Sequence, residues 1–161
     1  MKQEEYERRL VRLEDVQEIK DLHREYIYWV NECEWDKVLD CFTENAFANI
    51  GRHGPRRGKA ELVQLFKRDI HGNNKGKGRD GHIAMAPVIS VDGDRAKGHW
   101  LMYVMISDPD TGNALKWAHG RHDVEYLKDD GKWKMIGLSL PAHGQEKRGH
   151  SQGRSRNKRT C

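Results

Sequence analysis

The segment HDVEYLKDDGKWKM, residues 122–135, decides the fold of this 161-residue chain, because it has the pattern of two β-strands joined by a tight turn. Asp129-Asp-Gly131 has the composition of a hairpin turn. Before the turn, apolar and charged residues alternate, which is typical of a strand with one buried face. We therefore predict one strand over 114–128 and the next over 132–140.

The segments on the N-terminal side extend this hairpin into a sheet and a helical layer. Strands are predicted over 82–91 and 95–107, on either side of the turn signal Asp92-Gly-Asp94. Apolar residues at the helical period of about 3.6 predict helices over 13–33, 35–42 and 59–69, with a break at Thr43-Glu-Asn45 and a short hairpin over 46–57. The predicted class is α+β: a curved antiparallel sheet wrapped around an N-terminal helical layer, cone-shaped, with an internal pocket.

The composition fits one domain between two polar ends. Hydrophobic residues make up 36% of the chain and concentrate between Val16 and Leu140. We predict a charged N-terminal extension over 1–12, the α+β domain over 13–143 and a basic, disordered tail over 144–161. Six Lys and Arg residues follow residue 146 without an Asp or Glu, so the net charge of +4 belongs to the tail, and residues 1–146 carry a net charge of −2.

Several classes of protein are disfavoured by what the sequence lacks. The N-terminus has no apolar segment typical of a signal peptide, and no run approaches the ~20 apolar residues that cross a bilayer, so we expect a cytoplasmic protein without membrane partners. The three cysteines lack metal-ligand spacing; no metal site is expected, and Cys33 and Cys41 are predicted to be small core residues. The tail has no aromatic residue for stacking on bases, which disfavours nucleic acid as a partner.

Three stretches of the sequence carry a family resemblance: Ile19-Lys-Asp-Leu22 to Phe42-Thr-Glu-Asn-Ala46, Gly81-His82 to Gly98-His-Trp100, and Val124 to Met135. Together they cover about residues 13–141. They resemble the SnoaL-like branch of the nuclear-transport-factor-type cone fold, which includes scytalone dehydratase, bile acid dehydratase and hexachlorocyclohexane dehydrochlorinase. The resemblance implies this fold, but it does not choose one reaction, because the fold hosts dehydratases, isomerases, cyclases, dehalogenases and non-enzymes.

The resemblance implies a histidine-centred site. His82 matches the histidine that relatives use as general base or acid–base partner, and an imidazole with a pKa near ~6.5 suits that role. Without the resemblance, His82 reads as a solvated histidine at a loop end. Asn31 stands where relatives have an aspartate that orients and charges the histidine. An amide can hold the ring but cannot stabilise imidazolium by charge, and Asn31 faces either a cavity or a solvated rim.

Further polar candidates lie on the long strand and the first helix. Alternation puts His122 on an apolar strand face with Val124, which is compatible with a pocket-facing group and equally with a core histidine bonded to the backbone. Tyr26 matches a tyrosine of bile acid dehydratase and would donate a hydrogen bond to a substrate oxygen; plain core packing is the alternative. His99 is assigned to the outward face of its strand.

The family register implies an apolar wall for the pocket, formed by Trp100, Met102, Val104 and Ile106. Such a lining predicts a largely hydrophobic ligand with a few polar groups. The resemblance places the second histidine of scytalone dehydratase at a position near Ile106, where this chain has no histidine. The arginine that bile acid dehydratase has near the end of its sequence has no counterpart here. The usual catalytic set of these relatives is therefore incomplete.

The leading hypothesis is a cofactor-independent, dehydratase-like lyase or isomerase that acts on a small hydrophobic, cyclic molecule. His82 would move the proton, His122 and Asn31 would position the reacting groups, and Tyr26 would donate a hydrogen bond to the substrate. The alternative is a non-catalytic small-molecule-binding protein of the same fold, for which Asn31 is the chief support. A third hypothesis is an assembly or nucleic-acid protein that works through the basic tail. Relatives of this fold also imply a homo-oligomer, either a dimer or a trimer.

Overall fold

The structure is a computed structural model that describes residues 2–71, 80–108, 110–111 and 113–141. Its helices are α1 (Lys2–Glu32), α2 (Trp35–Asp40) and α3 (Lys59–Val63), the last continued by a π-helical stretch (Gln64–Ile70). Its strands are β1 (Phe42–Ile50), β2 (Pro55–Arg57), β3 (Gly81–Asp92), β4 (Arg95–Ser107), β5 (Ala114–Asp129) and β6 (Lys132–Leu140). A 3₁₀ turn, Gly51–His53, joins β1 to β2.

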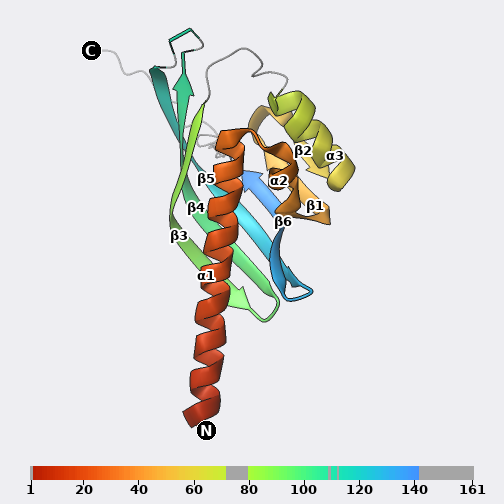
Figure 1. Cartoon of the computed structure of the whole chain (residues 1–161), viewed down its shortest axis with the longest axis vertical. Coiled ribbons are helices and arrows are strands. Elements are labelled where there is room, and N and C mark those ends of the chain that lie inside the picture. The colour runs from red at the N-terminus through yellow and green to blue at the C-terminus, as the bar shows by residue number, and fades with distance from the viewer. Residues whose placement is uncertain (1, 72–79, 109, 112, 142–161) are drawn as a thin grey trace, which may run out of the picture.

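The strands form one sheet in the order β2-β1-β6-β5-β4-β3 (Figure 1). The three hairpins of the β3–β6 region are antiparallel as predicted, but β1 pairs with β6 in parallel, so the prediction of a wholly antiparallel sheet is wrong at this pair. Residues 51–131 separate these two strands, and no hairpin dictates their relative direction. The α+β class and the curved sheet are confirmed.

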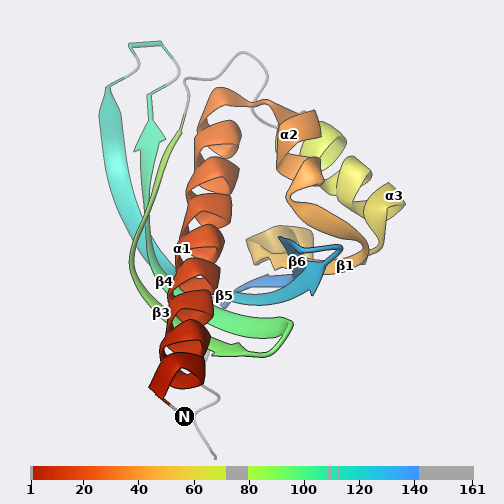
Figure 2. The same ribbon diagram turned by 60° about the horizontal axis from the view of Figure 1, so that its bottom comes forward.

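The sheet bends around α1, which lies along its hollow side (Figures 1 and 2). A bulge in β3 between Met85 and Val88, where Ala86 has φ of 48°, adds to this bend, because bulges increase local twist. Pro87 is tolerated there because β3 is an edge strand and one side needs no hydrogen-bond donors. The hollow side holds the core and the candidate site.

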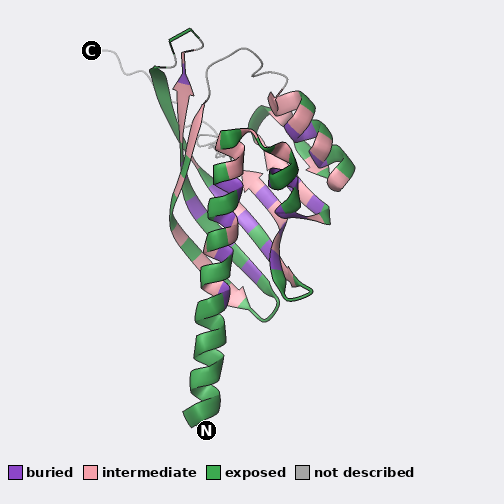
Figure 3. Cartoon of the chain, in the orientation of Figure 1, coloured by how far each residue is buried: buried purple, intermediate pink, exposed green. Residues whose placement is uncertain are grey.

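A row of side chains along α1 packs the helix against the sheet. The row is spaced at i, i+4 and alternates polar and apolar residues: Asp15, Ile19, His23, Ile27 and Asn31. The first four are buried and the last is half-buried. Residues 2–14 are all exposed, and this part of α1 projects past the sheet (Figure 3). The helix therefore begins well before the predicted residue 13.

Two local predictions near α2 are wrong. The helix does end before Thr43-Glu-Asn45, at Asp40, but these residues belong to β1, which begins at Phe42 rather than at Ala46, because the Met135 N–H donates to the Cys41 carbonyl at 2.9 Å and draws this segment against β6. Cys33 is half-buried rather than a core residue, since it ends α1 with φ of 59°, whereas Cys41 is buried as predicted. Cys161 and the tail lie outside the described residues.

Asp15 anchors the middle of α1 to the β5–β6 hairpin. Its Oδ1 accepts hydrogen bonds from Lys128 Nζ at 2.7 Å and from Trp133 Nε1 at 2.9 Å. Asp15 is 5% exposed, so both bonds form largely out of water. A carboxylate buried in this way stabilises the fold only while both donors are present.

We expect Asp15→Asn to lower the free energy of unfolding by about 1–3 kcal/mol, because the charge-assisted bond to Lys128 is lost in a buried setting. Urea denaturation measures this difference. Asp21→Asn is the matched control: Asp21 lies in the same helix but is exposed, and its loss should cost under about 0.5 kcal/mol. Equal effects of the two substitutions would contradict the anchoring role of Asp15.

Candidate active site

Two hydrogen bonds join the side-chain amide of Asn31 to the backbone of His82. The Asn31 Nδ2 donates to the His82 carbonyl at 2.9 Å, and the His82 N–H donates to Asn31 Oδ1 at 2.8 Å. These two bonds fix the orientation of the amide, because exchanging its oxygen and nitrogen would pair two donors and two acceptors. The last turn of α1 is thereby tied to the start of the edge strand β3.

The same amide oxygen also sets the protonation of the His82 ring. Asn31 Oδ1 lies 3.2 Å from His82 Nδ1, and an amide oxygen can only accept, so the ring proton sits on Nδ1 and Nε2 keeps its lone pair. His82 is half-buried, and burial lowers the pKa of its ring, while Asp80 acts in the opposite direction. A neutral imidazole with a free Nε2 is the form that can accept a proton.

A second polar cluster, the His23 cluster, lies deeper on the hollow side and consists of His23, Trp100, His122 and Tyr126. Trp100 Nε1 donates to the Tyr126 hydroxyl at 3.0 Å, and that hydroxyl lies 3.2 Å from His23 Nδ1. His23 Nε2 lies 3.4 Å from His122 Nδ1. The His23 ring stacks on Trp100 with centroids 4.1 Å apart. One chain of contacts therefore links α1, β4 and β5.

Burial keeps the titratable groups of this cluster uncharged. Burial lowers the pKa of His122 to about 3, with nearby His82 adding to the effect. It also places the pKa of His23 well below its ordinary value, with His122 as a second cause. The pKa of the Tyr126 hydroxyl is raised, again mainly by burial. At neutral pH the side chains of this cluster are therefore uncharged and act as hydrogen-bond donors and acceptors.

Gly98 makes room for this cluster. A Cβ at this position would lie 3.0 Å from Tyr126 Cε2 and 3.1 Å from Trp100 Nε1. Both contacts are closer than side chains normally allow, so any larger residue would push apart the two groups that share the indole hydrogen bond. Packing against Trp100 and Tyr126 therefore requires glycine at position 98.

The remaining predicted residues fall on the hollow side as well. Tyr26 is buried, with its ring 5.8 Å from Phe42 and 6.2 Å from His122, and burial raises the pKa of its hydroxyl. Trp100 and Met102 are buried, while Val104 and Ile106 are half-buried towards the end of β4. His82 pairs across the strands with Val104, which places it beside this apolar row.

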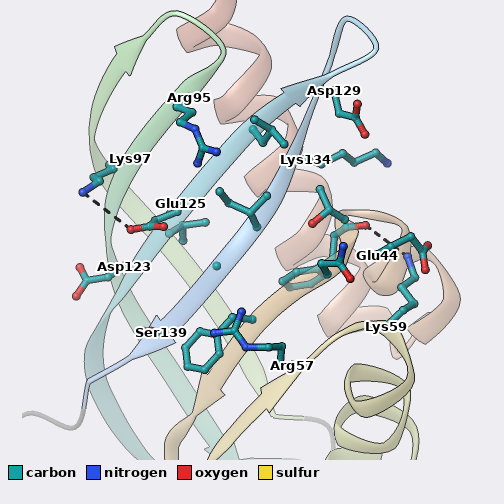
Figure 4. A pocket seen from close by; sticks show the side chains of 18 of the residues that line it. Glu44, Arg57, Lys59, Arg95, Lys97, Asp123, Glu125, Asp129, Lys134 and Ser139 are labelled. Carbon is teal, nitrogen blue, oxygen red and sulfur yellow. Dashed lines mark hydrogen bonds and ion pairs between the residues drawn. The ribbon is translucent and has the colours of Figure 1, made fainter.

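A groove of about 1200 Å³ opens on the other face of the sheet. Residues of both charges line it, and Figure 4 shows Arg95, Lys97, Asp123 and Glu125 on β4 and β5. His99 is exposed on this face, as predicted, with Nδ1 2.6 Å from Asp123 Oδ1. None of the predicted site residues lines the groove, so the candidate site and the groove are on opposite sides of the sheet.

The sequence alone does not single out His23 or Tyr126 as site residues. The signal for His23 is its place between Ile19 and Ile27 on the i, i+4 row, where a polar ring needs partners. Tyr126 shares the strand face of His122 at i+4. Their pairing across 103 residues comes only from the fold.

The described residues hold no group of three or more His, Cys, Asp or Glu side chains arranged to bind a metal ion. Over the same residues, none of the helices combines the length and the apolar character needed to span a bilayer.

This arrangement, a long N-terminal helix in the hollow of a curved six-stranded sheet, is the cystatin-like fold of the nuclear-transport-factor type. The model of the SnoaL-like domain matches residues 11–138, so the chain belongs to the SnoaL-like family. Comparison of the sequence with curated proteins gives no match.

Solved structures share this fold at low sequence identity. An NTF2-like protein from Novosphingobium aromaticivorans has a TM-score of 0.74 and 16% identity, covering 88% of this chain and 90% of its own. A hexachlorocyclohexane dehydrochlorinase has a TM-score of 0.70 and 17% identity, covering 82% and 87%. A proposed scytalone dehydratase from Novosphingobium aromaticivorans has a TM-score of 0.67 and 15% identity, covering 80% and 84%. At these identities the likeness establishes the fold alone.

We expect Asn31→Asp to raise the pKa of His82, because a carboxylate next to the ring favours imidazolium. The imidazolium-to-imidazole ratio should rise about tenfold at a given pH, equivalent to about 1.4 kcal/mol. A pH titration of the ring by NMR measures this. Asn113→Asp, in the exposed loop before β5, is the control and should leave the titration of His82 as in wild type. An unchanged titration in Asn31→Asp would contradict the contact between the two side chains.

Proposed function

We propose that the protein is a cofactor-independent lyase or isomerase that moves a proton on a small hydrophobic, cyclic molecule, with His82 as the general base. The observation that carries this proposal is the amide of Asn31, whose fixed oxygen faces His82 Nδ1 at 3.2 Å and leaves Nε2 unprotonated. A base needs its lone pair free and its ring held in place. The Asn31 contacts support both requirements.

The amide at position 31, in place of the aspartate of the relatives, changes the energetics of this base. A carboxylate at position 31 would stabilise the imidazolium formed after proton transfer, whereas an amide offers only a dipole. Because burial lowers the pKa of His82, the imidazolium is a transient state that has to pass its proton on quickly. A substrate that accepts the proton again, at another carbon or at a leaving group, fits this base.

The apolar row on β4 supports a hydrophobic substrate. Trp100 and Met102 form its buried part and Val104 lies beside His82 across the strand pair. A ring-shaped molecule lying against the half-buried Val104 and Ile106 would bring a C–H bond towards Nε2 of His82. One structural relative is named for a dehydrochlorinase of hexachlorocyclohexane, a small cyclic molecule, and this agrees with the proposed substrate class.

A second candidate function, binding without catalysis, is favoured by one observation: the amide at position 31 provides no charge for imidazolium. The two functions predict different results for Asn31→Asp. A gain of turnover would mark a decayed enzyme, while tight binding by the wild type without turnover would mark a binding module.

We expect the wild type to catalyse exchange of C–H protons with solvent deuterium in some members of a panel of small cyclic ketones, followed by NMR. His82→Gln should reduce the rate at least about 100-fold, because a positioned general base contributes about 10² to 10⁴. His99→Gln removes an exposed histidine from the opposite face and should retain the wild-type rate. Retention of exchange in His82→Gln would refute the assignment of the base.

The proposal extends to a homo-oligomer formed through the sheet face opposite α1. Exposed apolar side chains adjoin one another there across β3, β4 and β5: Ile83 with Tyr103, Met85 with Leu101, and Trp117 beside the half-buried Met105. Each of the first four is between 37% and 43% exposed, and Trp117 is 57% exposed. A continuous apolar patch of this kind is typical of a protein–protein contact, and a second copy supplies the same surface.

We expect light scattering to give the mass of two or three chains for the wild type and of one chain for Trp117→Asp, because a buried carboxylate would oppose the contact. Leu13→Asp is the control: Leu13 is 67% exposed on the projecting part of α1 and lies away from this patch. A wild type that is monomeric at high concentration would rule out this surface as an oligomer contact.

A further inference from the structure

The hydrogen bonds of the His23 cluster have a direction that starts at Trp100. An indole N–H can only donate, so the Tyr126 oxygen accepts from Trp100 Nε1 at 3.0 Å. The hydroxyl then has its own hydrogen left to donate. Its other partner among the described side chains is His23 Nδ1, at 3.2 Å.

This direction sets the protonation of both histidines in the cluster. When Tyr126 donates to His23 Nδ1, a neutral His23 carries its proton on Nε2. That Nε2 faces His122 Nδ1 at 3.4 Å and donates to it. A neutral His122 consequently carries its proton on Nε2, the nitrogen on the far side of its ring.

Burial prevents the alternative in which one of the rings becomes charged. His23 has no measurable exposure and His122 is 3% exposed. The groups that face them are the Trp100 indole, the Tyr26 and Tyr126 rings and each other, and none of these is an anion. Asp123, on the opposite strand face, favours a charged His122 but less than burial opposes it.

We propose that Trp100, Tyr126 and His23 are positioning residues that hold His122 as a fixed Nε2–H donor, which binds an acceptor oxygen of the substrate. This inference rests on the proposed function, in which His82 is the base. The two histidines are then held in opposite forms: His82 carries its proton on Nδ1 and offers a lone pair, while His122 offers a hydrogen. Two different devices, an amide on α1 and an indole on β4, produce these two forms.

The pair defines which substrates the site can process. His82 Nε2 takes the proton from a C–H bond next to a carbonyl, and the bonding electrons move onto the carbonyl oxygen. The His122 Nε2–H hydrogen-bonds that oxygen without losing its proton, as a preorganised donor for developing charge. His82 then returns the proton to another carbon, or to a hydroxyl that leaves as water when the new double bond forms. Atoms and charge balance without a cofactor.

Nitrogen NMR of the substrate-free protein labelled with ¹⁵N-histidine tests this chain directly. At pH 7 we expect His23 and His122 to carry their protons on Nε2, with the signals assigned by loss in His23→Gln and His122→Gln. Tyr126→Phe removes the relaying hydroxyl, so both rings should become mixtures of the two neutral forms. Tyr103→Phe, which removes an exposed hydroxyl from the other sheet face, should leave both rings as in wild type. A wild-type His122 with its proton on Nδ1, or as imidazolium, would overturn the proposal without the use of any variant.

The activity measurement separates this inference from the proposed function. Tyr126→Phe should slow deuterium exchange about tenfold, with a larger change in kcat than in KM, because the donor matters most as charge develops. If His122 is protonated on Nε2 but deuterium exchange does not depend on His82, the positioning role of Trp100, Tyr126 and His23 is supported and the proposed function is refuted. If deuterium exchange depends on His82 but is unaffected by Tyr126→Phe, the proposed function is supported and the positioning role is refuted.

Discussion

The i, i+4 row on α1 is the constraint on which the rest of the structure depends. Its three polar members each bond to a different part of the sheet: Asp15 to the β5–β6 hairpin, His23 to β5, and Asn31 to β3. Ile19 and Ile27 fill the spaces between them and are buried. A buried polar group without its partner is costly, so the helix can neither slide nor rotate without breaking all three sets of bonds.

This constraint explains why the candidate site lies where it does. The same turns of α1 that fix the helix also bring Asn31 to His82 and His23 to His122, so the site is assembled by the contacts that hold the fold together. An enzyme gains from such an arrangement because rings locked by packing need no reorganisation during proton transfer. The groove on the opposite face has charged walls and lacks these locked rings.

Much of this architecture could be predicted from the sequence because the determining signals are local. The turn at Asp129-Asp-Gly131 and the alternation around His122 predict the hairpin and the buried strand face. The parallel pairing of β1 with β6 could not be predicted, since it joins strands far apart in the sequence and does not follow from a turn. The partner of His23 was equally hidden, because a helical period shows that a side chain is buried but not which side chain it meets.

Chemical-shift mapping with a cyclic ketone that undergoes exchange tests most directly whether the hollow side of the sheet is the ligand site. Cyclohexanone or a close analogue should shift the indole N–H of Trp100, the methyl groups of Ile106 and the ring of His82, while Lys97 and Glu125 in the groove are unaffected. Shifts confined to Lys97, Glu125 and their neighbours would place the ligand on the opposite face and rule out the hollow side as the ligand site.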